Sequence, residues 1–170
     1  MGPRRLTLLR HGKAEAVDAC PEDFERALTH RGSIEAQNMA TRLVQRNLIP
    51  DLLLVSPAER AWATAEIIAA TCELDPKQVQ CARELYLGSP ETTWRLLAHC
   101  AASLSHIMIC GHNPALSQIA SRFGPKLQRR ELATAGIATA VWYRGDWHTL
   151  QPENADSCEL DDPDSMDDWI

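Results

Sequence analysis

The chain has 170 residues and a net charge of −6, and its 45% hydrophobic and 24% charged residues are ordinary for a single globular domain. No apolar stretch approaches 18 residues and the N-terminal segment lacks an apolar signal region, so we expect a cytoplasmic protein without membrane association. Residues 1–150 carry 17 Lys and Arg against 15 Asp and Glu, and this nearly neutral balance gives no support for nucleic-acid binding.

The six cysteines are scattered, with no C-x-x-C pair and no histidine spaced to complete a zinc site. We therefore expect reduced thiols in the core, and neither a metal site nor a cofactor.

Three short apolar runs without polar alternation predict strands that are buried on both faces, as parallel strands in an α/β sheet are. They comprise residues 6–9, 52–55 and 107–110. A further short strand is expected within 79–87, and a closing pair of strands at 137–143 and 147–150, joined by a turn at 144–146.

Helices are expected between these strands. Thr29 is a typical N-cap for a helix that runs to about Gln45. The Ser56-Pro57-Ala58-Glu59 segment predicts a capping box, Ser89 begins another helix, and Asn113 with Pro114 caps the next. The predicted fold class is therefore α/β: one layered domain with a mostly parallel central sheet and helices on both faces.

The acidity of the chain is concentrated at its C-terminal end. Residues 151–170 contain 8 of the 23 Asp and Glu and no Lys or Arg. We interpret 1–150 as the domain and 151–170 as a solvated acidic tail. Trp169 and Ile170 are unusual at the end of such a tail, and docking on a hydrophobic patch of this chain or of a neighbour is one role for them.

Polar residues follow each of the three predicted strands. Arg10 and His11 follow the first, Arg60 lies in the first turn of the helix after the second, and His112 follows the third. Because ligands of such sheets bind outside the carboxyl ends of the strands, two imidazoles and two guanidinium groups would meet in one cationic pocket. Such a pocket suits a phosphoryl group.

Four sequence blocks, taken together, resemble a known family. Leu9-Arg10-His11-Gly12, residues 26–32, residues 55–64 and Cys110-Gly111-His112-Asn113-Pro114 are similar in order and spacing to the histidine phosphatase superfamily. The compact size and the Leu85–Pro90 segment are most similar to its SixA-type branch, the phosphohistidine phosphatases. The resemblance covers residues 5 to about 143, and it implies a phosphoglycerate mutase-like fold.

The resemblance implies a role for each matching residue. His11 would be the nucleophile that forms a transient phosphohistidine, Arg10 and Arg60 would hold the phosphoryl oxygens, and His112 would donate to them. A neutral imidazole can attack phosphorus, and nearby guanidinium groups keep it neutral, so this chemistry needs no metal. Arg26 would contact substrate at the rim of the pocket, although a surface salt bridge is an equally good interpretation, and Asn113 is a second candidate for substrate binding.

Two carboxylates are candidates for the general acid. Family members that cleave phosphate esters use a carboxylate to protonate the leaving group, and the segment that supplies it contains Glu84 here. A solvated strand end is the other interpretation of Glu84, and Glu15 is a further candidate. A phosphoramidate needs less help, because imidazole leaves more readily than an alkoxide does.

Three functions remain open at this stage. The first is a metal-independent phosphatase that acts on phosphohistidine in a phosphoprotein. The second keeps the pocket but acts on a small phosphate ester. The third is a phosphate-binding protein with negligible turnover, whose acidic tail mediates assembly. The sequence does not predict an oligomeric state.

Overall fold

The computed structural model describes residues 2–165. A six-stranded sheet forms its centre, with the strand order β3-β2-β4-β1-β5-β6. The strands are β1 (Arg4–Arg10), β2 (Leu52–Val55), β3 (Val79–Cys81), β4 (His106–Gly111), β5 (Ile137–Trp142) and β6 (Ser157–Asp161). The first four strands of that order run parallel, whereas β5 is antiparallel to both β1 and β6.

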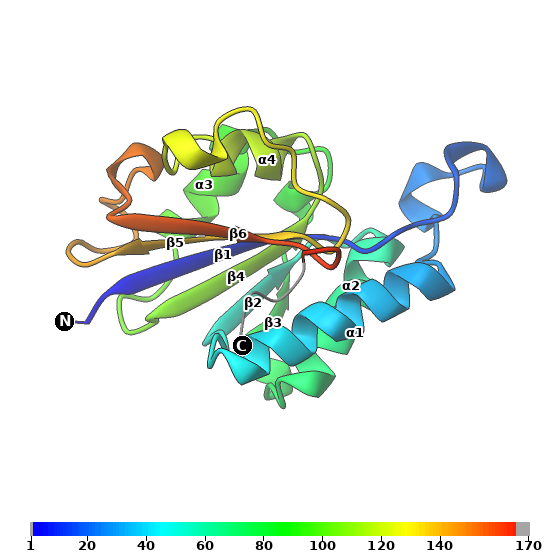
Figure 1. Cartoon of the computed structure of the whole chain (residues 1–170), viewed down its shortest axis with the longest axis horizontal. Coiled ribbons are helices and arrows are strands. Elements are labelled where there is room, and N and C mark those ends of the chain that lie inside the picture. The colour runs from blue at the N-terminus through cyan, green and yellow to red at the C-terminus, as the bar shows by residue number, and fades with distance from the viewer. Residues whose placement is uncertain (1, 166–170) are drawn as a thin grey trace.

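Helices cover both faces of the sheet (Figure 1). They are α1 (His30–Gln45), α2 (Glu59–Thr71), α3 (Pro90–Ala98) and α4 (Ala115–Ala120). One core cluster packs α1 and α2 against the sheet through residues such as Met39, Leu43 and Ile68, and a second packs α3 and α4 through Leu97, Leu116 and Ile119. The predicted α/β layered fold is confirmed.

The strands β1, β2 and β4 form where the apolar runs predicted them, because their side chains are buried on both faces of the sheet. Helix α1 begins as expected: the Thr29 hydroxyl accepts a hydrogen bond from the backbone N–H of Gly32 at 3.0 Å. Ser89 caps α3 in the same way.

The C-terminal part of the sheet differs from the prediction. Residues 147–150 do not form a strand; the chain turns there, and Trp147 is buried with its indole N–H donating to the carbonyl oxygen of Leu104 at 2.8 Å. The strand that pairs with β5 is instead β6, inside the segment that was interpreted as a solvated tail. The domain therefore continues past residue 150. Trp169 and Ile170 lie outside the described residues.

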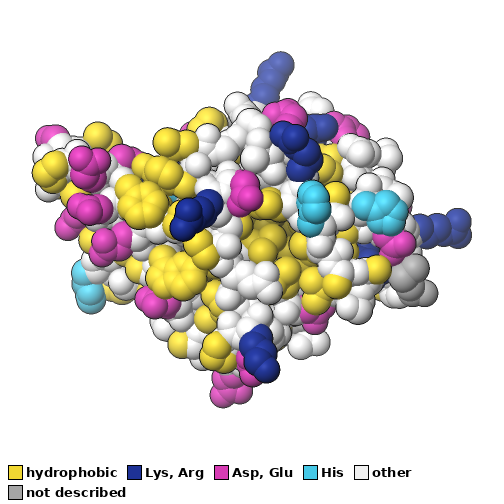
Figure 2. All heavy atoms as spheres, turned by 180° about the vertical axis from the view of Figure 1, so that it is seen from behind, with side chains coloured by type: hydrophobic (Ala, Val, Ile, Leu, Met, Phe, Trp, Pro, Cys, Tyr) yellow, Lys and Arg dark blue, Asp and Glu magenta, His cyan; other side chains and the backbone are white. Residues whose placement is uncertain are grey.

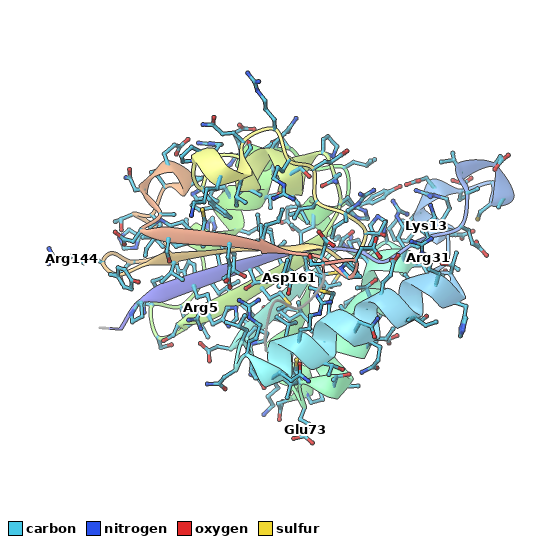
Figure 3. The ribbon with its side chains drawn as sticks, viewed as in Figure 1. Arg5, Lys13, Arg31, Glu73, Arg144 and Asp161 are labelled. Carbon is cyan, nitrogen blue, oxygen red and sulfur yellow. The ribbon has the colours of Figure 1, made fainter. Side chains whose placement is uncertain are left out.

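The acidic residues of β6 have defined partners on α1 and at its C-cap. Arg42 donates to the Asp161 carboxylate at 2.7 Å, and Arg46 donates to Glu159 at 2.6 Å. Asp161 is labelled in Figure 3. Cys158 and Leu160 of the same strand pack against the core. The segment was interpreted as a tail because it is acidic, but its acidic side chains form ion pairs within a strand.

Candidate active site

The central position of β1 and β4 brings two histidines together. These strands are neighbours, with Arg10 paired to Gly111, so the residues that follow them leave the sheet side by side. The backbone N–H of His11 donates to the carbonyl oxygen of Gly111 at 3.1 Å, and the rings of His11 and His112 are 5.2 Å apart between centroids. Arg60 reaches the same place from the first turn of α2.

His11 is held with one ring nitrogen fixed and the other directed toward Arg60. Its Nδ1 donates to the carbonyl oxygen of Gly12 at 2.8 Å, which places the ring proton on Nδ1 because a carbonyl oxygen only accepts. Nε2 is then an acceptor, and the Nε–H of Arg60 donates to it at 3.3 Å. Burial, together with the charges of Arg60, Arg10 and Arg26, outweighs the bond to Gly12 and lowers the pKa of His11 to about 4. His11 is therefore a neutral imidazole near pH 7, as a nucleophile must be.

The loop that carries His11 is fixed by backbone contacts that leave no room for a side chain. A Cβ at Gly12 would lie 2.5 Å from the carbonyl oxygen of Gly32, at the start of α1. The buried hydroxyl of Thr64 accepts from the backbone N–H of Gly12 at 3.0 Å and donates to the carbonyl oxygen of Arg60 at 2.7 Å. Thr64 thus ties the His11 loop to the turn that carries Arg60.

His112 is oriented by Ser56, a residue for which the sequence predicted another role. Ser56 lies 2.7 Å from Nε2 of His112, and its oxygen also accepts from the backbone N–H of Ala58 at 3.3 Å. The described residues offer the Ser56 hydroxyl no other acceptor, so its proton points to Nε2 and the ring proton of His112 lies on Nδ1. The predicted capping box is wrong, because Ser56 is engaged by His112 and α2 begins after Ala58 without a side-chain cap.

The Nδ1–H of His112 is an unsatisfied donor. It is buried and has no hydrogen-bond partner. Burial, the neighbouring His11 and the charge of Arg60 lower the pKa of His112 to about 3, against the attraction of Asp23. A phosphoryl oxygen placed between the two histidines would satisfy this group, since a buried donor without an acceptor is unfavourable.

Asp23 connects the two arginines at the rim. Its carboxylate accepts from Arg60 at 3.1 Å, from Nε of Arg26 at 2.9 Å and from the hydroxyl of Tyr86 at 2.8 Å, and its backbone carbonyl accepts from Arg60 at 2.7 Å. Although burial raises the pKa of Asp23, the Tyr86 hydroxyl and the two guanidinium groups lower it to about 2. Asp23 is therefore an anion near pH 7, and it holds the far edge of the Arg60 guanidinium while Nε faces His11.

Arg10, at the end of β1, is the second arginine that acts on His11. Its guanidinium donates to the carbonyl oxygen of Leu132 at 2.8 Å, and its Nε is buried without a partner. Burial lowers the pKa of Arg10 from its ordinary value, and the carboxylates of Glu131 and Glu35 oppose that shift. The side chain is close enough to disfavour protonation of His11.

Asp23, Arg26, Arg60 and His112 border a cavity of about 640 Å³, the active-site cavity, on the face where α3 and α4 pack. Its lining includes Asp23, Arg26, Arg60, Tyr86, His112 and Asn113. His11 and Arg10 are not part of its lining, but the ring of His11 contacts Arg60 and His112, which are. A cavity with cationic and imidazole donors converging near a neutral imidazole can bind a tetrahedral anion and transfer its phosphoryl group.

Comparisons with known proteins identify the family. Residues 6–106 match the model of the histidine phosphatase superfamily (branch 1). The chain belongs to this superfamily. It is 34% identical over 135 residues to an uncharacterized protein of Picosynechococcus, covering 78% of this chain and 81% of that protein.

Solved structures place the chain in the SixA-like branch of the superfamily. The putative phosphohistidine phosphatase SixA from Agrobacterium tumefaciens superposes with a TM-score of 0.74 at 28% identity, covering 82% of this chain and 92% of that one. The protein histidine phosphatase SixA in complex with tungstate has the same fold, with a TM-score of 0.75 at 24% identity and coverage of 94% and 97%. The chain is a phosphatase with the phosphoglycerate mutase-like fold.

The structure does not bring every predicted residue into the active-site cavity of this histidine phosphatase. Glu84 lies on an exposed 3-10 turn and borders a different depression, together with Asp51, Lys77 and His99. The short strand predicted through 79–87 ends at Cys81, and the turn that follows directs Tyr86, not Glu84, to the cavity. The carboxylate of Glu15 accepts from the backbone N–H of Ala27.

The two predicted substrate-binding residues line the cavity but already have partners. Asn113 donates to the carbonyl oxygen of Leu132 at 3.0 Å and accepts from the hydroxyl of Ser117 at 2.6 Å. It is not the N-cap of α4, since Pro114 occupies that position. Arg26 donates to Asp23 and to the carbonyl oxygen of Glu15 at 2.7 Å, so its salt bridge is part of the rim of the cavity.

Four residues of the site were not predicted from the sequence: Ser56, Thr64, Asp23 and Tyr86. The spacing of Asp23 and Arg26, three residues apart in a loop, was the one local signal for any of them. Among residues 2–165, no three His, Cys, Asp or Glu side chains are placed to hold a metal ion. Over the same range no helix is long and apolar enough to span a membrane.

Proposed function

We propose that this phosphatase hydrolyses phosphohistidine on a protein, through a transient phosphohistidine at His11 and without a metal ion. One observation carries the proposal: a neutral His11 contacts Arg60 and His112, which line a cavity whose carboxylate, Asp23, is held as an anion. The site therefore offers a nucleophile and phosphate donors but no protonated carboxyl group for a poor leaving group.

The first step is attack by Nε2 of His11 on phosphorus. The bond from Nε2 to phosphorus forms as the bond from phosphorus to the substrate nitrogen breaks, and the electron pair leaves with the substrate imidazole. Arg60, Arg10 and the Nδ1–H of His112 stabilise the charge on the transferring oxygens. The proton on Nδ1 of His11 stays bonded to Gly12, and this bond stabilises the positive charge that the ring acquires.

Water completes the cycle by attacking the phosphorus bound to His11. The bond from the water oxygen to phosphorus forms as the bond to Nε2 breaks, and both protons of the water leave with the inorganic phosphate. His11 returns to its neutral form, with its proton still on Nδ1. Both steps depend on positioning and on electrostatic stabilisation, and these come from side chains of the chain itself.

The choice of phosphoramidate over ester rests on the leaving group. An alkoxide must be protonated as it leaves, whereas the imidazole of a phosphohistidine can leave with its second nitrogen already protonated. Asp23, with a pKa of about 2, holds no proton to give near pH 7. The likeness to SixA proteins supports the same choice.

A cytoplasmic location is part of this proposal. All six cysteines are free. Free thiols persist in reducing compartments, and a protein phosphohistidine in such a compartment is the partner that we propose.

His11→Ala tests the nucleophile. The variant should release phosphate from phosphoramidate more than about 1,000-fold more slowly than the parent chain, because it lacks the imidazole that forms the covalent intermediate. The assay contains a chelator. The stability in acid of labelled phosphate trapped on the parent enzyme identifies the adduct. Undiminished turnover by His11→Ala would rule this residue out.

Asp23→Asn tests the leaving-group argument. If Asp23 only holds Arg60 and Arg26, the variant should lose about tenfold in kcat/KM on phosphoramidate and on p-nitrophenyl phosphate alike. A much larger loss on an alkyl phosphate than on phosphoramidate would make Asp23 a proton donor and would favour the ester phosphatase instead. A screen of phosphohistidine protein, phosphoramidate and alkyl esters on the parent enzyme gives the reference rates.

A further inference from the structure

A second depression lies beside the active-site cavity and is separate from it. It has a volume of about 500 Å³ and is bordered by one face of α2 and by the loop between β1 and α1. Glu59, Trp62, Ala63 and Glu66 contribute from α2, at the i, i+3, i+4 and i+7 spacing that places them on a single face of the helix. Phe24 and Glu25 contribute from the loop. We call this depression the α2 groove.

Two aromatic side chains form the apolar part of the α2 groove. Phe24 is 40% exposed, and its ring packs edge-on against Tyr86 at 5.0 Å. Since Tyr86 lines the active-site cavity, this pair forms the ridge between the cavity and the groove. Trp62 packs one side against the core under α2, and none of the described residues accepts a hydrogen bond from its indole N–H. Figure 2 shows hydrophobic and acidic side chains side by side on the end of the molecule that the loop forms.

The charges of the α2 groove have one sign. Glu25, Glu59 and Glu66 are exposed, and none of their carboxylates has a hydrogen bond or an ion pair with any described residue. No Lys or Arg borders the groove. By contrast, the carboxylates of Asp23 and Glu35 nearby are engaged by Arg26 and Arg31 respectively.

We propose that the α2 groove binds the segment of the protein substrate that adjoins its phosphorylated histidine, and that this segment carries lysine or arginine next to an apolar side chain. The inference rests on the proposed function and specifies its substrate. Exposed aromatic side chains are typical anchors of protein interfaces, and three unpaired carboxylates complement a basic partner. The same carboxylates repel phosphate, so the groove is not a second site for the phosphoryl group.

The test compares two short phosphohistidine peptides with flanking leucines, one containing lysines and the other glutamates in the same positions. On the parent enzyme, kcat/KM should favour the lysine peptide by about tenfold at low salt, and the preference should shrink as ionic strength rises. The double variant E25K/E66K should lose or invert the preference. Phosphoramidate, which is too small to reach the groove, should be hydrolysed equally by the parent and the variant.

Glu73→Lys is the matched control. It makes the same charge change as either single substitution of the double variant, just beyond the C-terminal end of α2, on a side chain that points away from the molecule in Figure 3. This variant should keep the parent preference between the peptides. Trp62→Ala should lower kcat/KM on the lysine peptide about tenfold and leave phosphoramidate turnover unchanged, which also shows that it folds.

Equal kcat/KM values of the parent enzyme on both peptides would contradict the proposed role of the α2 groove. The same change in peptide preference in Glu73→Lys as in E25K/E66K would also contradict it. A dimer in sedimentation that both groove variants dissociate would also overturn it, because the occupant would be a second copy of the chain. If the parent enzyme does not hydrolyse phosphoramidate at all, the proposed function fails instead. Calorimetry with the unphosphorylated peptides then still tests the α2 groove, because the lysine peptide should bind more tightly than the glutamate peptide.

Discussion

Strand β4 is flanked by a histidine at each end, and the two histidines differ in what they contact. His106, its first residue, has both ring nitrogens engaged, by the hydroxyl of Thr7 at 2.9 Å and by the carbonyl oxygen of Ile49 at 3.1 Å. His112 follows its last residue and leaves Nδ1 without a partner beside the active-site cavity.

Burial lowers the pKa of both histidines strongly, to about 4 for His106 and about 3 for His112. A shifted pKa therefore does not distinguish the structural histidine from the one in the site. The unsatisfied donor and the neighbouring cavity do.

The largest difference in kcat should appear when His112 and His106 are each replaced by glutamine. Glutamine can place its amide near the position of Nε2 but has no group near Nδ1. His112→Gln should thus keep its contact with Ser56 and lose the donor to the phosphoryl group, with a fall of about 100- to 1,000-fold in kcat on phosphoramidate. His106→Gln should keep kcat within about twofold. Comparable losses of kcat in the two variants would contradict the distinction between the ends.

The next largest effect should be a loss of stability in acid, which His106 causes. Because the pKa of His106 is about 4 when folded and about 6.5 when unfolded, the unfolded chain binds more protons between these values, so stability falls as the pH drops from about 6.5 toward 4. At pH 5, proton binding by His106 in the unfolded chain lowers the free energy of unfolding by about 2 kcal/mol. Urea unfolding of the parent chain and of His106→Gln between pH 7 and pH 5 measures it, and the variant should lose less stability over this range. Parallel pH dependence of the two chains would show that His106 does not titrate on unfolding.

The smallest effects should come from the hydroxyl partners of the two histidines. Ser56→Ala removes the group that holds the ring proton of His112 on Nδ1, and we expect a loss of about tenfold in kcat with little change in unfolding free energy. Thr7→Val should do the opposite: activity is retained, and stability falls by about 1–3 kcal/mol because a buried His106 nitrogen loses its partner. Ser56→Thr, which keeps the hydroxyl, should restore part of the lost rate and is the control for packing.

The comparison also shows what the sequence could predict. Apolar runs predicted β1, β2 and β4, since strands buried on both faces are mostly apolar, and the residues that follow these strands predicted where His11, His112 and Arg60 meet. The prediction for Ser56 was wrong because a local capping pattern was outcompeted by a contact 56 residues away along the chain. Asp23 was missed for a similar reason, because two of its partners, Arg60 and Tyr86, come from distant segments.

The errors at Glu84 and β6 arose from short elements. The 3-10 turn after β3 changes which side chain faces the cavity, and strand periodicity cannot anticipate such a turn. In β6, alternation of Cys158 and Leu160 with polar residues was present, but the density of acidic residues favoured an interpretation as a tail.

The position of β6 has a practical consequence for anyone who shortens the chain. Cutting it after residue 150 would remove the charged strip at the margin of the sheet and leave the apolar Ile137–Trp142 backbone groups open to pairing with other molecules. The β6 carboxylates that pair with Arg42 and Arg46 thus help to prevent aggregation. A truncated chain that precipitates would have lost this protection and not its catalytic groups.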